Sequence, residues 1–167
     1  MKDHPDDHLA ERFEAMSDRD KIDFMIETNG WAIEAVQPDA ETDPPTPGYA
    51  YTIGLTADVG FPEVAVFGLT PAASKGLLTL VADACRGGTE IRHGVELVGL
   101  LDNELRCMFA PIDLSPWGPY FLAAASWYDG MSFEIVQLLY PDRNGFMPYE
   151  IGYEQRMTLA QPVIGTV

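Results

Sequence analysis

Basic residues, cysteine and long apolar runs are scarce in this sequence, and each scarcity excludes a class of protein. Ten Lys and Arg stand against 26 Asp and Glu, for a formal net charge of −16. Such a surface repels a phosphate backbone, so we expect no nucleic-acid partner. Cys85 and Cys107 form no CxxC pair, which leaves a disulfide framework or a cysteine zinc site unsupported. No apolar stretch approaches the ~20 residues of a membrane span, so we expect no membrane association.

Recognisable targeting and catalytic motifs are also missing. The first residues, Met1-Lys2-Asp3-His4, contain no apolar run typical of a signal peptide, which predicts a soluble cytoplasmic protein with reduced thiols. The sequence holds no GxSxG elbow, GxGxxG loop, P-loop or HExxH pair. It therefore identifies neither a reaction nor a cofactor, and whether the protein is an enzyme stays open.

The composition that is present describes one folded domain with an acidic start. The chain has 167 residues, of which 47% are hydrophobic, enough for a single core without disulfide or metal support. Residues 1–43 hold 4 basic and 13 acidic residues. We divide the chain into an acidic N-terminal arm over residues 1–16 and a single α+β domain over residues 17–167.

Three segments have helical signals at their ends. Ser17 and Gly30 are typical of the cap residues of a helix between them, with apolar residues at helical spacing. Thr70-Pro71 begins a second helix, which ends at Gly87-Gly88. A third starts near Ser115-Pro116 or Gly118-Pro119 and ends at Asp129-Gly130.

Strand patterns fill most of the remaining chain. Runs of β-favouring residues predict strands over 31–36, 49–55, 62–69 and 133–140, and the second and third suit an antiparallel hairpin. A meander is expected over 90–92, 95–101 and 104–114, with its turn at Asp102-Asn103. Asn144-Gly145 predicts a hairpin that returns through residues 146–151. The fold class is α+β, with a largely antiparallel sheet, partly closed and split-barrel-like as an open alternative, flanked by two or three helices.

Three sequence blocks resemble a known family. They are YAYTIGL at 49–55, FPEVAVFGL at 61–69 and QLLYPDRNGFMPYE at 137–150. Together they resemble the bacterial domain-of-unknown-function family DUF4262, over residues 23–163. The resemblance implies a single soluble domain and no particular chemistry.

A second likeness, over residues 51–69, is to the split barrel of flavin reductases. It suggests flavin binding as an alternative, by analogy of fold. A flavin phosphate needs backbone donors or basic side chains. Beyond residue 43 the basic residues are Lys75, Arg86, Arg92, Arg106, Arg143 and Arg156.

The charged residues that follow the last apolar strand are one candidate site. Asp142 and Arg143, with Glu150 a short way on, could position a substrate or supply a base, because sites often lie on loops held by a sheet. The competing interpretation, which we favour, is a turn in which Asp142 caps its own backbone ahead of Asn144-Gly145.

A second candidate site involves Glu63 with Tyr51 and Thr52. Glu63 opens an apolar strand, and we expect it at the rim of the sheet, with a polar pocket shared with Tyr51 or Thr52 as the alternative. Burial there would raise the pKa of Glu63 and make it a candidate acid or base.

Aromatic rings are plentiful and could line a small-molecule cleft, although core packing is the commoner use. The set is Tyr49, Tyr51, Trp117, Tyr120, Trp127, Tyr128, Tyr140 and Tyr149. The histidines do not form a metal site by pattern: His4 and His8 lie among aspartates of the arm, and His93 stands alone beside Gly94.

Three functional hypotheses remain. The leading one is a non-enzymatic domain that binds a partner protein or a small ligand. The first alternative is an enzyme with a pocket near Glu63, Asp142 and Arg143. The second is an acidic inhibitor or immunity-type protein that binds a basic partner in a salt-sensitive way. An exposed edge strand would also permit a homodimer.

Overall fold

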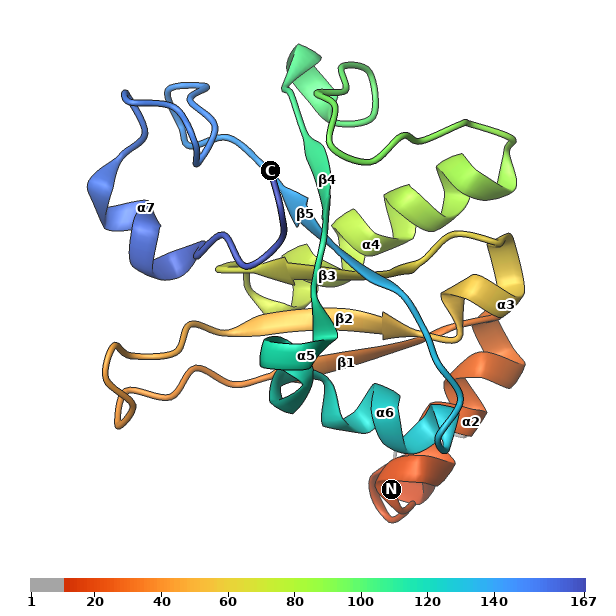
Figure 1. The fold of residues 1–167 in the computed structure, drawn as a ribbon. Coiled ribbons are helices and arrows are strands. Elements are labelled where there is room, and N and C mark those ends of the chain that lie inside the picture. Colours follow the sequence, from red (N-terminus) through yellow and green to blue (C-terminus); the bar gives the residue numbers. More distant parts are fainter. Residues whose placement is uncertain (1–10) are drawn as a thin grey trace, which may run out of the picture.

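The computed structural model of the protein describes residues 11–167, and its centre is one five-stranded sheet in the order β1-β2-β3-β5-β4 (Figure 1). The strands are β1 Ala32–Val36, β2 Tyr49–Ile53, β3 Glu63–Phe67, β4 Met108–Pro111 and β5 Ile135–Leu139. Three neighbouring pairs are antiparallel, and β3 with β5 is parallel. The sheet is open. The α+β class is confirmed, and the split-barrel alternative is not realised.

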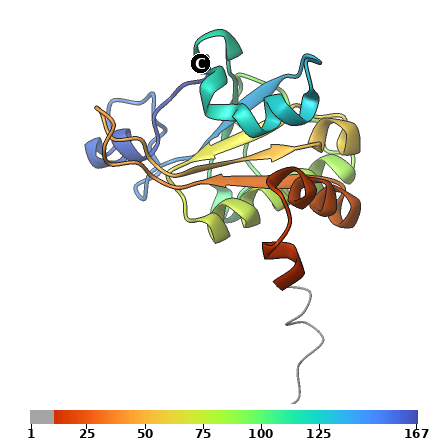
Figure 2. The ribbon, with the colours of Figure 1, turned by 90° about the horizontal axis from the view of Figure 1, so that it is seen from below.

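Helices cover both faces of this sheet. They are α2 Asp18–Asn29, α3 Leu55–Val59, α4 Pro71–Arg86, α5 Leu114–Trp117, α6 Leu122–Tyr128 and α7 Gln155–Ala160, with 3-10 turns η1 Asp102–Glu104 and η2 Gly118–Phe121. Figure 2 shows the sheet between α4 on one side and α5 with α6 on the other. The six named α-helices, together with a short helical stretch at residues 11–14, exceed the two or three expected, because four of the six have seven residues or fewer and lack a long apolar period. Within the same residues, no helix has the length and apolar character needed to cross a bilayer.

Both long helices begin and end where their cap residues predict. The Ser17 hydroxyl accepts a hydrogen bond from the Asp20 backbone N–H, and Gly30 ends α2 with a positive φ. Thr70 caps α4 in the same way, with Pro71 as its first residue. The predicted ends of both helices are confirmed. They could be predicted because capping depends on residues that are near neighbours in the chain.

The pleat of the strands divides the core between the two faces. Ala50, Val64 and Val66 face α4, whereas Tyr51, Ala65 and Phe67 face α6. At the β4–β5 side of the second face, Met147 from a later loop packs on Met108 and Leu139. Every residue of β2, β3 and β5 is buried, so these three strands form the rigid centre of the molecule.

Two strand predictions are wrong, and one connection differs from expectation. The meander over 90–114 is reduced to β4, η1 and one isolated bridge between Leu97 and Cys107. Residues 146–151 form turns without a strand, followed by α7. The link between β2 and β3 contains the short helix α3. In the first two cases the tertiary context overrides a local β preference. The first ten residues of the expected acidic arm, with His4 and His8, lie outside the described residues.

Candidate functional site

Glu63, the first residue of β3, lies in the interior and not at the rim, where we expected it. Its side chain is fully buried. The carboxylate accepts hydrogen bonds from the backbone N–H groups of Leu55 at 3.0 Å and Gly54 at 3.2 Å. Gly54 has φ of +89°, a conformation that favours glycine, and it turns the chain from β2 into α3. Glu63 therefore stabilises the turn between these two elements.

Three hydroxyl groups complete the surroundings of the Glu63 carboxylate. Thr52 donates at 2.8 Å and Thr56 at 3.4 Å, and the Tyr128 hydroxyl from α6 donates to Oε2. The Thr52 oxygen in turn accepts from the backbone N–H of Val64 at 2.9 Å. A carboxylate offers about four lone-pair sites, and five donors contact this one. No acceptor position is left for a substrate.

The pKa values in this cluster follow from burial. Burial raises the pKa of Glu63, and the hydrogen bonds from Tyr128, Thr52 and the Leu55 backbone oppose that rise. Burial also raises the pKa of Tyr128, and its bond to Glu63 adds to the effect. Tyr128 therefore remains a protonated donor at neutral pH.

Tyr51 has a different place from its neighbour Thr52. It is buried, and its ring packs edge-on against Phe121 at 5.1 Å between centroids. Burial raises its pKa, with the charge of Glu34 as a second cause. Tyr51 is a core residue of the α6 face.

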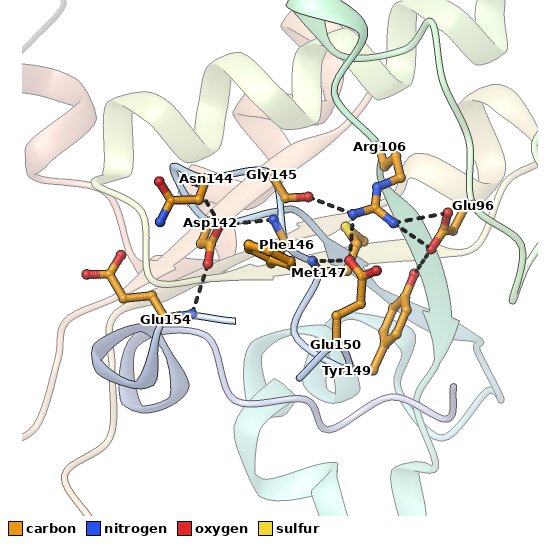
Figure 3. Close-up of polar contacts among 10 residues, drawn as sticks. All are labelled: Glu96, Arg106, Asp142, Asn144, Gly145, Phe146, Met147, Tyr149, Glu150 and Glu154. Carbon is orange, nitrogen blue, oxygen red and sulfur yellow. Dashed lines mark hydrogen bonds and ion pairs between the residues drawn. The ribbon is translucent and has the colours of Figure 1, made fainter. Parts of the chain in front are cut away.

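Asp142 organises the loop that follows β5 (Figure 3). Its Oδ1 accepts from the backbone N–H groups of Asn144 at 2.9 Å and Phe146 at 3.0 Å, and its Oδ2 accepts from that of Glu154 at 2.8 Å. Burial alone would raise the pKa of Asp142, but these backbone donors outweigh it and the pKa is lowered. The geometry agrees with the interpretation that Asp142 caps its own backbone.

Glu150 belongs to an ion-pair network on the same loop (Figure 3). Arg106, which precedes β4, donates to Glu150 at 2.5 Å, to the Gly145 carbonyl at 2.6 Å and to Glu96 at 3.2 Å. The bond from Arg106 lowers the pKa of Glu150. Tyr149 donates to Glu96 at 2.5 Å. Arg106 and Glu96 were not among the candidate residues, because the network joins them to Gly145, Tyr149 and Glu150, which lie 39 to 53 residues further along the chain.

The two groups of candidate residues lie at opposite ends of the sheet. Glu63 pairs in register with Ile135, the first residue of β5, whereas Asp142 follows the last. The strand β5 lies between them and is itself roughly 13 Å long from Ile135 to Leu139, at about 3.3 Å per residue. Arg143 is largely exposed and forms an ion pair with Glu154, at 3.4 Å. The structure does not bring Glu63, Asp142 and Arg143 together into the one pocket that we expected as an alternative.

An aromatic cleft of about 520 Å³ is the site that the structure adds. Its lining residues come from three chain segments, which are the loop before β2, the turn from α5 into η2, and the segment from α7 to the C-terminus. It is lined by Thr42, Asp43, Pro44, Pro45, Thr46, Pro47, Trp117, Tyr120, Thr158, Leu159, Pro162 and Ile164. The density of proline before residue 48 and the two rings at 117 and 120 were visible in the sequence. The sequence did not show that the proline-rich segment and these two rings lie close together.

The two rings of this cleft are held by the core. Trp117 and Tyr120 meet edge to face, with centroids 5.5 Å apart. Tyr120 packs against Tyr49 at 5.5 Å, and its carbonyl oxygen accepts the Tyr49 hydroxyl hydrogen at 2.8 Å. Both rings are only partly buried. They present a fixed apolar surface to the cleft.

Metal ligands are not grouped in the described part of the chain, where no cluster of three or more His, Cys, Asp and Glu could hold an ion. His93 is exposed and packs edge-on against Phe61 at 5.6 Å. It lines a cleft of about 420 Å³ with Asp113 and Phe133, and Glu63 is not among the lining residues of that cleft. The buried carboxylate and the nearest cleft are thus separate.

The geometry defines an α+β domain with an open mixed sheet, two carboxylates committed to internal hydrogen bonds, and one aromatic cleft. The chain belongs to the family described as a domain of unknown function, DUF4262, whose model matches residues 25–154. This confirms the resemblance seen in the three sequence blocks. No curated protein and no solved structure matches the chain.

Proposed function

We propose that this domain is a non-enzymatic binding module and that the aromatic cleft holds its ligand. The observation that carries the proposal is the pair Trp117 and Tyr120, partly buried, in a concave site of about 520 Å³ with mostly apolar neighbours. Ligand sites are typically concave, mostly apolar and held in shape before binding, with volumes of ~300–1,000 Å³. Aromatic side chains give such sites a large contact area at little entropic cost.

The hydrogen bonds that the Glu63 and Asp142 carboxylates already accept support a binding function over a catalytic one. A general acid or base needs to reach the proton that it transfers. Glu63 is surrounded by donors from its own chain, and Asp142 accepts three backbone N–H groups. Both acids are already used to hold loops in place. The flavin alternative depended on closure of the sheet into a barrel, and we do not propose it.

Charge and thiols support two further parts of the proposal. With a net charge of −16, the chain favours a cationic partner and disfavours nucleic acid. Cys85 and Cys107 are both free thiols, which supports a reducing compartment, and we propose the cytoplasm.

Protein-observed NMR with a library of small aromatic, aliphatic and amine-bearing fragments tests the cleft. The chain has three tryptophans, so its indole N–H signals are few, and Trp117→Phe assigns the one of interest. We expect fragments that bind to shift the signals of Trp117 and Tyr120, and to lose about tenfold or more in affinity with Trp117→Ala.

Trp127→Phe is the matched control, since Trp127 is also partly buried but bonds to Asp23 on α2, away from the cleft. Fragments that bind equally well to the Trp117→Ala protein, or that shift signals only elsewhere, would reject the cleft as the binding site.

A further inference from the structure

The walls of the aromatic cleft restrict how an occupant can be held. The loop before β2 contributes Pro44, Pro45 and Pro47, which have no backbone N–H to donate. This wall therefore cannot pair with an added β-strand along those residues. It can make apolar contacts with an extended chain, which is how aromatic and proline-lined grooves bind polyproline-type segments.

The same wall is internally bonded. Asp39 and Thr46 exchange two backbone hydrogen bonds, at 2.9 and 2.8 Å. The Thr42 hydroxyl contacts the Thr46 hydroxyl at 2.8 Å and accepts from its backbone N–H at 2.8 Å. Because the loop is already ordered, binding requires little further loss of backbone entropy.

Polar groups in the cleft favour a peptide-like occupant with a positive charge. Within residues 11–167, the indole N–H of Trp117 has no hydrogen-bond partner, so it is available to a carbonyl oxygen of a ligand. Asp43 carries the only charge among the lining residues described, and Asp39 and Glu41 lie in the same loop. Acidic groups beside an apolar surface raise the on-rate for a cationic partner and select against an anionic one.

The third wall lies beyond the segment that the family model matches. Thr158, Leu159, Pro162 and Ile164 all follow residue 154. Leu159 is 59% exposed, a large apolar side chain that an occupant would cover. The wall is held from the sheet, because Gln137 of β5 donates to the Pro162 carbonyl at 2.7 Å and accepts from the Ile164 N–H at 2.9 Å.

We propose that the aromatic cleft binds an extended segment of a partner protein, with proline or other apolar residues on Trp117 and Tyr120 and a lysine or arginine facing Asp43. This inference rests on the proposed function and adds the chemistry of the partner. Residues 158–164 then determine which apolar residues the segment carries.

Selection from a phage-displayed library of random 12-residue peptides against the full chain tests this inference, with the Trp117→Ala protein as the counter-selection. We expect enriched peptides to combine proline or aliphatic residues with at least one lysine or arginine. The most enriched peptide is then synthesised with a fluorescent label, and its affinity is measured by polarisation at low and high salt.

Truncation of a central aromatic contact typically weakens binding about 30-fold, which we expect for Trp117→Ala. For Asp43→Asn we expect a loss of about three- to fivefold and a weaker salt dependence, as for an exposed charge pair. Trp127→Phe is the control and leaves the affinity unchanged. Replacing the basic residue of the peptide by glutamate lowers the affinity further than Asp43→Asn does.

Three outcomes overturn the inference. Enriched peptides without apolar residues would indicate attraction by charge alone. Enriched peptides that are acidic would contradict the role of Asp43. If no peptide is enriched over the counter-selection while fragments still shift the Trp117 signal, the cleft binds small molecules, so the peptide inference fails and the proposed function stands.

Discussion

Glu63 and Asp142 are two acidic residues at opposite ends of the sheet that accept similar hydrogen bonds and have opposite pKa shifts. Each accepts backbone N–H donors from a turn. For Glu63 burial is the larger effect and raises the pKa, whereas for Asp142 the donors outweigh burial and lower it. Similar hydrogen bonds thus accompany opposite pKa shifts, because the balance between burial and the donors differs between the two carboxyl groups.

The largest effect in this comparison is expected from Glu63→Ala. Removing the carboxylate leaves the buried N–H groups of Gly54 and Leu55 without an acceptor, and each such group costs about 1–3 kcal/mol. We expect a loss of about 3–5 kcal/mol in the free energy of unfolding, measured by urea denaturation. Glu134→Ala is the control, since Glu134 is the exposed residue just before β5. A loss below about 1 kcal/mol would mean that Glu63 does not hold this turn.

The opposite pKa shifts predict opposite pH dependences of stability. A raised pKa in the folded state means that the native protein binds more protons between the two pKa values. The stability of the wild type relative to Glu63→Gln should therefore fall as pH rises above about 4.3. The pKa of Asp142 is lowered, so the advantage of the wild type over Asp142→Asn should be present above about pH 3.9 and lost below it.

Urea midpoints of the three proteins between about pH 3 and 8 measure these two differences, within the range where Asp, Glu and His side chains titrate. Parallel curves for the wild type and Glu63→Gln would contradict the raised pKa of Glu63.

A smaller effect is expected from Tyr128→Phe. This change removes one hydroxyl donor from the Glu63 carboxylate and keeps the ring, which stacks on Phe133 at 4.5 Å between centroids. We expect a loss of about 1 kcal/mol in the free energy of unfolding, together with a further rise in the pKa of Glu63. Carboxyl NMR titration of Glu63 measures that rise, and an unchanged or lower pKa would show that Tyr128 does not stabilise the charged form.

The smallest effect is expected from Arg106→Gln, at the Asp142 end. Arg106 contacts Glu96 and Glu150 at the surface, where water and salt screen ion pairs. We expect a small decrease in the urea midpoint at low ionic strength that disappears at about 0.5 M salt, where the Debye length is a few Å. A decrease that persists at high salt would show that the bond from Arg106 to the Gly145 carbonyl, and not its charge, holds the loop.

Features that depend on near neighbours in the chain could be predicted from the sequence. The caps of α2 and α4 and the buried run of β5 were read correctly, as was the turn capped by Asp142. For Glu63 the sequence offered a polar pocket with Thr52 only as an alternative to the rim, and the helix that covers the carboxylate could not be predicted, because Tyr128 lies 65 residues away. The ion pair of Arg106 with Glu150 could not be predicted for the same reason, since the two residues lie 44 positions apart in the chain.

By itself the sequence determined the acidic charge, the single α+β domain, the long helices and the family, because these follow from composition, local capping and recurring blocks of residues. Tertiary structure alone decided three further points: the sheet is open, the candidate acids lie apart, and Trp117 and Tyr120 share a cleft with residues 42–47 and 158–164. The physical reason is that register and strand order set which distant segments meet, and a local pattern carries no information on either.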